Sequence, residues 1–195
     1  MAHFLVIHGL QNHRPEGHWH RRLVTALRQQ GHVVAYPQLP SPDAPVLEDW
    51  LEVVDTELKL LSDSGANDVV VIAHSLGCVT WLRYITSHLL PVTISRVLFV
   101  APADPELLAA DAPTFVEDFE VSSAREAFAH LNPTILASDN DEWLPRGVAE
   151  TFGNPLKVAP IVWSGAQHFS LSDGWGEWRG VIEWATDPRA DLCVR

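Results

Sequence analysis

The stretch that most constrains this chain is residues 69–78, which read Val-Val-Val-Ile-Ala-His-Ser-Leu-Gly-Cys. Four β-branched residues predict a buried strand, and the pattern that follows from residue 76 is typical of a helix. Ser75 stands between the two, with a small residue two positions away on each side. A sharp turn of this kind, from a strand into a helix, exposes a serine hydroxyl at the edge of a sheet. We therefore interpret Ser75 as a candidate nucleophile.

Strand-like apolar runs alternate with helix-like periodicity along the whole chain. The strand-like runs are residues 3–7, 32–36, 69–73, 94–100, 133–137 and 156–163. The helix-like stretches are residues 18–30, 43–61, 76–89, 122–130, 145–152 and 174–185, with Asp43 as the expected N-cap of the second. Such alternation predicts a parallel sheet covered by helices on both faces. We therefore predict a single α/β domain over residues 1–195, built on about six mostly parallel strands.

The composition argues against several classes of protein. A formal net charge of -12 offers no basic face to nucleic-acid phosphates, and no apolar run approaches the roughly 18 residues of a membrane span. The N-terminus begins directly with a strand-like run and shows no secretory leader, so a cytoplasmic location is expected. Neither the two cysteines, Cys78 and Cys193, nor the scattered histidines, His18 and His20 included, have the spacing of a metal site. We expect no metal and no other cofactor.

Polar residues of chemical interest follow the strands at their carboxyl ends, which is where ligands sit in an open parallel sheet. These residues are His8 and Gly9 after the first strand, Ser75 after the third, Asp104 after the fourth, Asp139 and Asp141 after the fifth, and His168 after the last. Unrelated loop residues would have no reason to collect at one edge in this way. The sequence therefore predicts a site in which they meet.

A serine hydroxyl needs a base within hydrogen-bond reach to act as a nucleophile. His168, immediately after the last expected strand, is the candidate base. Asp104, Asp139 and Asp141 are all candidates for the acid that orients this histidine, and their spacing does not choose among them. The developing oxyanion needs backbone N–H donors. Leu76 is expected to supply one of them.

The second backbone donor is expected from the loop after the first strand. Leu10 or Gln11 would supply it, and Gly9 would let the backbone approach the serine closely.

The chain resembles an α/β-hydrolase, and in particular the small serine hydrolases of the retinoblastoma-binding protein 9 and YdeN type. The matching pieces are Val6-Ile7-His8-Gly9, Gly17-His18-Trp19, the proline-rich segment 36–50, Ala73-His74-Ser75-Leu76-Gly77, Ser138 through Asp141 to Pro145, and Gln167-His168-Phe169. Together they span nearly the whole chain. The sequence departs from the family pattern at Ala73 and at Ala166-Gln167, where relatives often carry glycine before the histidine.

The resemblance implies a catalytic triad of Ser75, Asp141 and His168. In the family the acid lies in a Ser-x-x-Asp-x-x-x-Pro context, which maps onto Ser138, Asp141 and Pro145 and leaves Asp139 as the runner-up. It also implies hydrolysis of small carboxylic esters or related acyl compounds through an acyl-enzyme. Leu10 and Leu76 would then supply the oxyanion hole.

Two other hypotheses about the function remain open from the sequence alone. The chain could be a hydrolase-like scaffold that binds protein with little turnover, or a thioesterase or amidase that uses the same residues. Residues 101–132 have no strand signal and are the only stretch long enough to form a short cap over the sheet edge. Their modest length favours an open pocket for small acyl groups.

Overall fold

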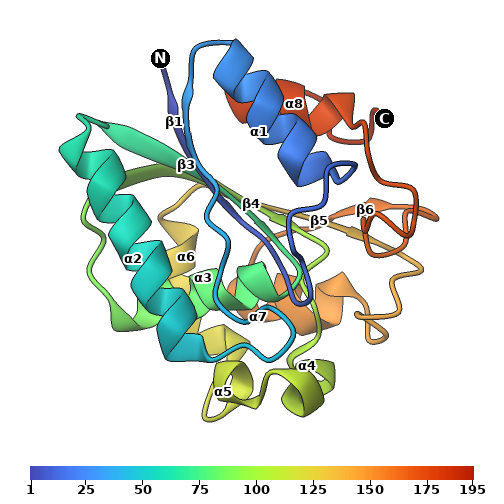
Figure 1. Cartoon of the computed structure of the whole chain (residues 1–195). Coiled ribbons are helices and arrows are strands. Elements are labelled where there is room, and N and C mark those ends of the chain that lie inside the picture. The colour runs from blue at the N-terminus through green and yellow to red at the C-terminus, as the bar shows by residue number, and fades with distance from the viewer.

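A six-stranded sheet forms the centre of the computed structural model, which describes residues 1–195 (Figure 1). The strands are β1 (His3–Ile7), β2 (Val33–Ala35), β3 (Asp68–His74), β4 (Thr93–Val100), β5 (Pro133–Ser138) and β6 (Ile161–Trp163). Their order across the sheet is β2-β1-β3-β4-β5-β6, and every neighbouring pair is parallel. The predicted fold class is confirmed. All strand carboxyl ends therefore lie at one edge of the sheet.

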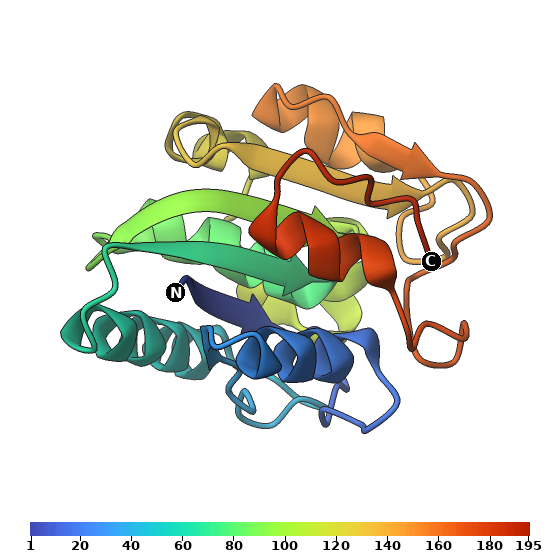
Figure 2. The same ribbon diagram turned by 90° about the horizontal axis from the view of Figure 1, so that it is seen from above.

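Helices cover both faces of this sheet (Figure 2). The structure contains α1 (Trp19–Gln29), α2 (Leu47–Asp63), α3 (Leu76–Ser87), α4 (Pro105–Asp111), α5 (Pro113–Val116), α6 (Arg125–Ala129), α7 (Asn154–Leu156) and α8 (Arg179–Thr186). A 3₁₀ turn, η1 (Val121–Ala124), precedes α6, and a π-helical turn, η2 (Ala149–Gly153), precedes α7. None of these helices combines the length and apolarity that crossing a bilayer requires.

Two hydrophobic cores lie on opposite faces of the sheet because side chains alternate along each strand. Leu5 and Ile7 of β1 join the core under α2 and α3, whereas Phe4 and Val6 join the tryptophan-rich core under α1 and α8. A strand that is buried on both faces needs an unbroken apolar run. This requirement accounts for the apolar residues of β1 and β3.

The start of α2 corrects one sequence expectation. The helix begins at Leu47, and its N-cap, Val46, offers no side-chain hydrogen bond. Asp43, the expected cap, instead accepts hydrogen bonds from Nε2 of His13 at 3.1 and 3.0 Å. Pro45 disfavours helical backbone in the residue before it, so the helix starts after the last proline of this segment.

The C-terminal elements are shorter than predicted, and they are shifted along the chain. The expected strand 156–163 is reduced to β6, because α7 runs to Leu156 and Lys157 turns into the left-handed region at φ 59°. The expected helix 145–152 is replaced by η2 and α7. The expected helix 174–185 begins only at Arg179, since Gly174, at φ 81°, ends a turn and Trp178 is extended.

Residues 101–132 form α4, α5, η1 and α6, and α4 and α5 lie at the bottom of the molecule in Figure 1. Leu108 of α4 and Phe115 of α5 are fully buried in the same core as α2 and α3. The hydroxyl of Thr114 accepts the N–H of Leu47 at 3.0 Å, which joins α5 to the start of α2. The segment is therefore packed onto the body of the domain.

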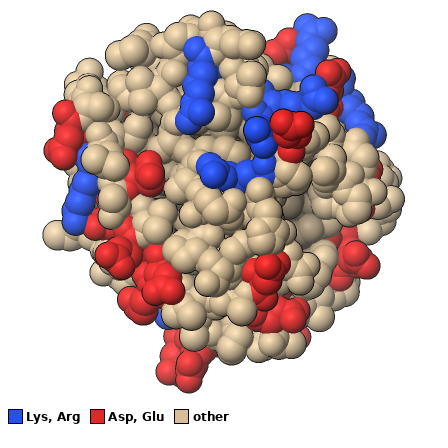
Figure 3. All heavy atoms as spheres, in the orientation of Figure 1, with Lys and Arg blue, Asp and Glu red and all other residues tan.

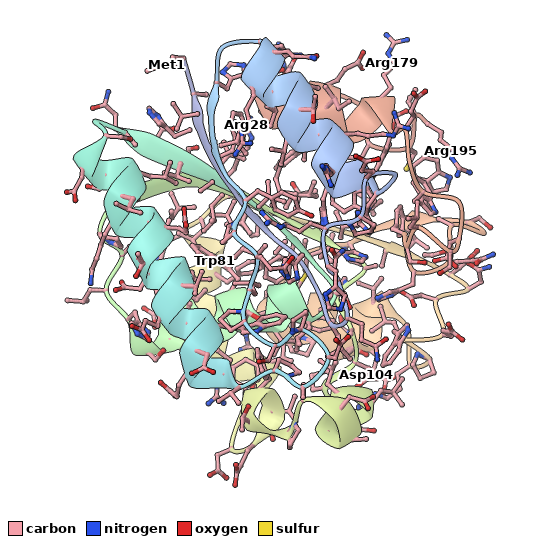
Figure 4. All side chains as sticks on the ribbon, viewed as in Figure 1. Met1, Arg28, Trp81, Asp104, Arg179 and Arg195 are labelled. Atoms are coloured by element: carbon pink, nitrogen blue, oxygen red, sulfur yellow. The ribbon has the colours of Figure 1, made fainter.

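Charge is distributed unevenly on the face drawn in Figure 3. Lys and Arg gather toward the top, over α1 and α8, and Asp and Glu gather below them. Arg28, Arg179 and Arg195 lie on the upper side in Figure 4, and Asp104 lies near α4 on the lower side. Although the net charge of the chain is -12, Lys and Arg side chains form a cationic region around α1.

Gly77 should tolerate no side chain, because a Cβ at that position would lie 2.7 Å from the backbone oxygens of His8 and of Ile7. Gly77→Ala should lower the free energy of unfolding by about 3 kcal/mol, the cost of overpacking against rigid backbone. Urea denaturation measures the loss. Gly17→Ala is the matched control, since its nearest neighbour is the flexible tip of Leu171 at 3.1 Å. Equal stability of the two variants would contradict the expectation.

Candidate active site

Ser75 occupies the sharp turn between β3 and α3, as the sequence predicts. Its backbone lies in the left-handed region, at φ 55° and ψ −124°, where a non-glycine residue costs roughly 1–3 kcal/mol. Gly9 and Gly77 make room for this turn: a Cβ on Gly9 would lie 2.7 Å from Cβ of Ser75. Ala73, which replaces the usual glycine, is fully buried in β3. The turn therefore accommodates its methyl group.

Three of the predicted residues meet at the carboxyl edge of the sheet. Nε2 of His168 lies 2.9 Å from Oγ of Ser75. On the other side of the ring, Nδ1 lies 2.9 Å from each carboxylate oxygen of Asp141. The imidazole thus stands between a hydroxyl and a carboxylate, the order in which a base must sit to accept a proton from serine.

Asp141 is almost fully buried, and its carboxylate is held in place. Its Oδ1 also accepts the backbone N–H of Trp143 at 2.9 Å. A buried carboxylate that accepts hydrogen bonds from two neighbouring groups is fixed in orientation. It can therefore hold the imidazole in the tautomer that carries its proton on Nδ1.

The other two candidate aspartates are engaged elsewhere. Asp104 caps α4 by accepting the N–H of Glu106 at 3.0 Å, and it binds Arg146 through both oxygens at 2.8 and 2.6 Å. Asp139 is exposed and accepts the N–H of Gly165 at 2.8 Å. That backbone hydrogen bond is the main cause that lowers the pKa of Asp139. Neither carboxylate contacts the imidazole of His168.

Two residues that adjoin Ser75 carry candidate backbone donors: Leu76 follows it in the chain, and Leu10 lines the same hollow. Leu76 is the first residue of α3, so its N–H has no acceptor within the helix and lies at the positive end of the helix dipole. In the loop after β1, the N–H of Gln11 donates to the carbonyl of Pro42 at 2.7 Å, whereas the N–H of Leu10 donates to no protein acceptor. Of the two residues that the sequence left open, Gln11 thus has its N–H engaged, and the N–H of Leu10 is free to donate.

His8 fixes the peptide that contains the N–H of Leu10. Its Nδ1 donates to the carbonyl of Gly9 at 2.9 Å, and its Nε2 accepts the N–H of Leu39 at 3.0 Å. These bonds require a neutral ring, and burial lowers the pKa of His8 to about 4. Because the Gly9 carbonyl and the Leu10 N–H belong to one peptide plane, the bond to His8 sets the direction of that N–H.

The loop that carries His168 has an unusual backbone. Gly165, Gln167 and Phe169 all have positive φ, at 73°, 56° and 54° respectively. Glycine adopts this region freely, but the left-handed region costs other residues about 1–2 kcal/mol each. Gln167 stands where relatives often carry glycine, so the departure noted in the sequence falls on a strained position. The surrounding structure must hold the loop in place.

The serine lies between two hollows in the surface. One, of about 200 Å³, includes Leu10, Leu108 and Trp143 in its wall. The other, of about 380 Å³, is mostly polar and includes His13, His18 and His74. Ser75 and His168 line both of them. A substrate can therefore extend in two directions from the serine hydroxyl.

Three histidines form a buried cluster beside the serine. This corrects the interpretation, made from the sequence, that they are scattered. One ring nitrogen of each of His18, His20 and His74 lies within 4.8 Å of those of the other two. Both ring nitrogens of His20 and Nδ1 of His74 are buried without a hydrogen-bond partner. No spacing rule signals the cluster, because His74 comes from a strand distant in sequence.

The cluster is the set of side chains that could hold a metal ion. Its three nitrogens lie within 4.8 Å of one another, and ligand nitrogens around tetrahedral zinc at 2.0–2.1 Å stand roughly 3.4 Å apart. Nδ1 of His18 also accepts the N–H of His20 at 3.2 Å and caps α1, which puts the proton of a neutral His18 on Nε2. Burial lowers the pKa of His18 to about 4 and those of His20 and His74 well below their ordinary value.

Comparison with known proteins points to one family. A family model described as serine hydrolase matches residues 4–185. The YdeN protein of Bacillus subtilis is 26% identical over 172 residues, which cover 87% of this chain and 86% of YdeN. The YdeN crystal structure superposes with a TM-score of 0.76 at 22% identity, over 95% of this chain and 97% of YdeN.

More distant structures have the same architecture. A YdeN-like protein of Pectobacterium atrosepticum superposes with a TM-score of 0.71 at 20% identity, over 95% of this chain and 89% of its own. A monoacylglycerol lipase of Paleococcus ferrophilus superposes with a TM-score of 0.60 at 16% identity, over 94% of this chain and 93% of its own. At such identities the likeness establishes the fold.

Acid should destabilise this protein through its buried imidazoles. The pKa values of His8 and His18 are lowered to about 4, whereas an unfolded chain titrates histidine near 6.5. Between these values the unfolded state binds more protons, so stability present at neutral pH is lost as the pH falls from about 6.5 toward 4. Each group accounts for ~3 kcal/mol. Urea midpoints at about pH 7 and pH 5 measure the loss.

His20→Phe separates this effect from general acid sensitivity. It keeps an aromatic ring while removing two nitrogens that have no partner. Removing an unsatisfied buried polar group should leave stability at neutral pH unchanged or higher, and should make the loss at pH 5 smaller. The exposed His130→Phe serves as the control. A His20→Phe protein as acid-sensitive as the wild type would contradict the assignment.

Proposed function

This chain belongs to the serine hydrolase family and has the α/β-hydrolase fold, and from that premise we propose that it cleaves small carboxylic esters with Ser75 as the nucleophile. The observation that carries the proposal is the hydrogen-bonded chain from Oγ of Ser75, through both nitrogens of His168, to the carboxylate of Asp141. Each link is 2.9 Å long, within the range of a true hydrogen bond.

In the first half of the reaction, neutral His168 accepts the proton of Ser75 through Nε2 while Oγ attacks the acyl carbon. Asp141 holds the proton of the ring on Nδ1 and stabilises the imidazolium that forms. The imidazolium then gives its proton to the departing alkoxide, and the acyl group remains on Oγ. In the second half, water loses a proton to His168 and attacks the acyl carbon. The imidazolium then returns that proton to Oγ as the acyl–oxygen bond breaks, which releases the acid and restores the serine and the neutral imidazole.

The negative charge that develops on the carbonyl oxygen needs donors that are already oriented. The N–H groups of Leu76 and Leu10 supply them: the first lies at the N-terminus of α3, and the second belongs to the peptide that His8 holds. Preorganised donors of this kind cost no reorganisation at the moment of reaction. The Gln11 N–H takes no part, because it is bound to Pro42.

Two features favour a small ester as the substrate. The smaller hollow beside Ser75, with Leu10, Leu108 and Trp143 in its wall, holds only about 200 Å³, which suits a short acyl group, and the larger hollow leaves room for the leaving group. The structural relatives include a monoacylglycerol lipase, an enzyme whose name describes the cleavage of an acyl ester. Leu108 brings residues 101–132 into the wall of the smaller hollow.

Ser75→Ala should reduce turnover of p-nitrophenyl acetate by about 10³-fold or more, because it removes the nucleophile. It should also abolish labelling by a fluorophosphonate probe, which reacts with activated serines. Ser87→Ala is the matched control: it lies in α3, the helix that follows Ser75, but on its exposed last turn. Wild-type protein that neither turns over the ester nor reacts with the probe would favour a hydrolase-like binding scaffold.

Leu108→Ala should shift the acyl preference toward longer chains. The change enlarges the smaller hollow, and one methylene in an apolar pocket alters specificity by about 10-fold. The measurement is the ratio of kcat/KM for p-nitrophenyl hexanoate to that for acetate. Leu58→Ala, buried in the same core on α2, should lose similar stability without changing the ratio. An unchanged ratio in Leu108→Ala would place the acyl group elsewhere.

A further inference from the structure

We infer that Ser138 and Asn140 are positioning residues for the catalytic histidine: together they hold residues 166 and 167 in the strained backbone that aims His168 at Ser75. The inference rests on the proposed role of His168 as the base. It assigns a function to the segment between β5 and the triad acid, which the reaction mechanism itself leaves unused.

The His168 loop is fixed through its backbone N–H groups. Asp139 accepts the N–H of Gly165, and Asp173 accepts the N–H of His168 at 3.1 Å. Between these two, the hydroxyl of Ser138 accepts the N–H of Ala166 at 2.8 Å, and the amide oxygen of Asn140 accepts the N–H of Gln167 at 2.8 Å. Four successive N–H groups therefore end on side chains.

The loop carbonyls are also bound by side chains from other elements. Nε1 of Trp175 donates to the carbonyl of Ala166 at 2.8 Å, Nε2 of His74 donates to that of His168 at 2.8 Å, and Nε1 of Trp19 donates to that of Phe169 at 3.0 Å. Trp19 lies in α1 and His74 in β3, and Trp175 follows the loop in the chain. The N–H side, by contrast, depends largely on the single segment 138–141.

Ser138 and Asn140 act as a pair. The Ser138 hydroxyl has one proton and two acceptors in reach, the amide oxygen of Asn140 at 2.7 Å and the carbonyl of Trp163 at 3.0 Å. Through the shorter contact, the Asn140 oxygen accepts from Ser138 as well as from Gln167. Ser138 is buried, and Asn140 is exposed beside it. Neither side chain titrates in the physiological range, so the support they give is independent of pH.

The need for this pair follows from the backbone of Gln167. With φ at 56°, Gln167 immediately precedes His168, and Phe169, at φ 54°, immediately follows it. A change in either residue swings the imidazole away from Ser75, and a misplacement of about 1 Å can cost 10²-fold in rate. Asn140 fixes the N–H of Gln167. The same four-residue segment thus places the backbone of His168 and, through Asp141, its side chain.

The test is the effect of Ser138→Ala and Asn140→Ala on the rate of the chemical step. Each variant should lower kcat for p-nitrophenyl acetate, and the rate of fluorophosphonate labelling, by about 10-fold or more, with KM changed less than about 2-fold. Adding Gln167→Gly to either variant should recover at least half of the loss in kcat, measured on a logarithmic scale. The reason is that glycine adopts the left-handed region without a steric penalty. Rescue by a glycine at position 167 is not expected if Ser138 and Asn140 only stabilise the fold.

Asn132→Ala is the matched control. Asn132 also stands at an end of β5 with positive φ, 45°, and its amide donates to the carbonyl of Ser95 at 2.9 Å. It should lower the melting temperature without changing kcat. If Ser138→Ala fails to fold, the inference is tested by Asn140→Ala alone, because Asn140 is exposed. Unchanged kcat in Asn140→Ala, or no recovery on adding Gln167→Gly, would overturn the inference.

A second readout separates this inference from the proposed function. The Nδ1 proton of His168, held against Asp141, should give a low-field ¹H NMR signal in the wild type that weakens in Asn140→Ala and returns with Gln167→Gly. Wild-type protein without esterase activity or labelling would count against the proposed function only. The NMR signal would still test the positioning of His168, and its persistence in Asn140→Ala would overturn the inference.

Discussion

The left-handed backbone of Ser75 is the constraint on which the rest of the site depends. That conformation turns the chain from β3 into α3 within one residue and presents the hydroxyl beyond the sheet. It is possible only because the chain after β1 passes close by without a side chain at Gly9, and because Gly77 lies against the backbone of β1. The pairing of β1 with β3 is therefore a requirement of the site as well as of the fold.

Backbone strain is also present in the loop that carries His168. The loop of His168 has two non-glycine residues in the left-handed region, and hydrogen bonds from several elements hold it there. Ser75 and the loop of His168 thus both have backbone that would relax if it were free. Local strain that the surrounding structure overcomes is typical of functional sites. Here the strain keeps the imidazole and the hydroxyl at hydrogen-bond distance before any substrate arrives.

Burial keeps the imidazoles around the serine neutral. His8, His18, His20 and His74 all have pKa values lowered mainly by burial, so none adds positive charge beside His168 at neutral pH. A neutral ring keeps one N–H to donate and one nitrogen that can accept. His8 orients the Gly9–Leu10 peptide in this way, and His74 binds the carbonyl of His168.

The sequence by itself determined the parallel sheet, the turn at Ser75 and the edge at which the polar loops collect, because hydrophobic periodicity and a serine flanked by small residues report on local conformation. Periodicity did not locate the C-terminal elements, where left-handed residues such as Lys157 interrupt the pattern. Nor did spacing decide between Asp139 and Asp141, or bring His18, His20 and His74 together. Only the tertiary structure decided these points, because they depend on contacts between residues far apart in the chain. The packing of the whole sheet sets the distances between such residues.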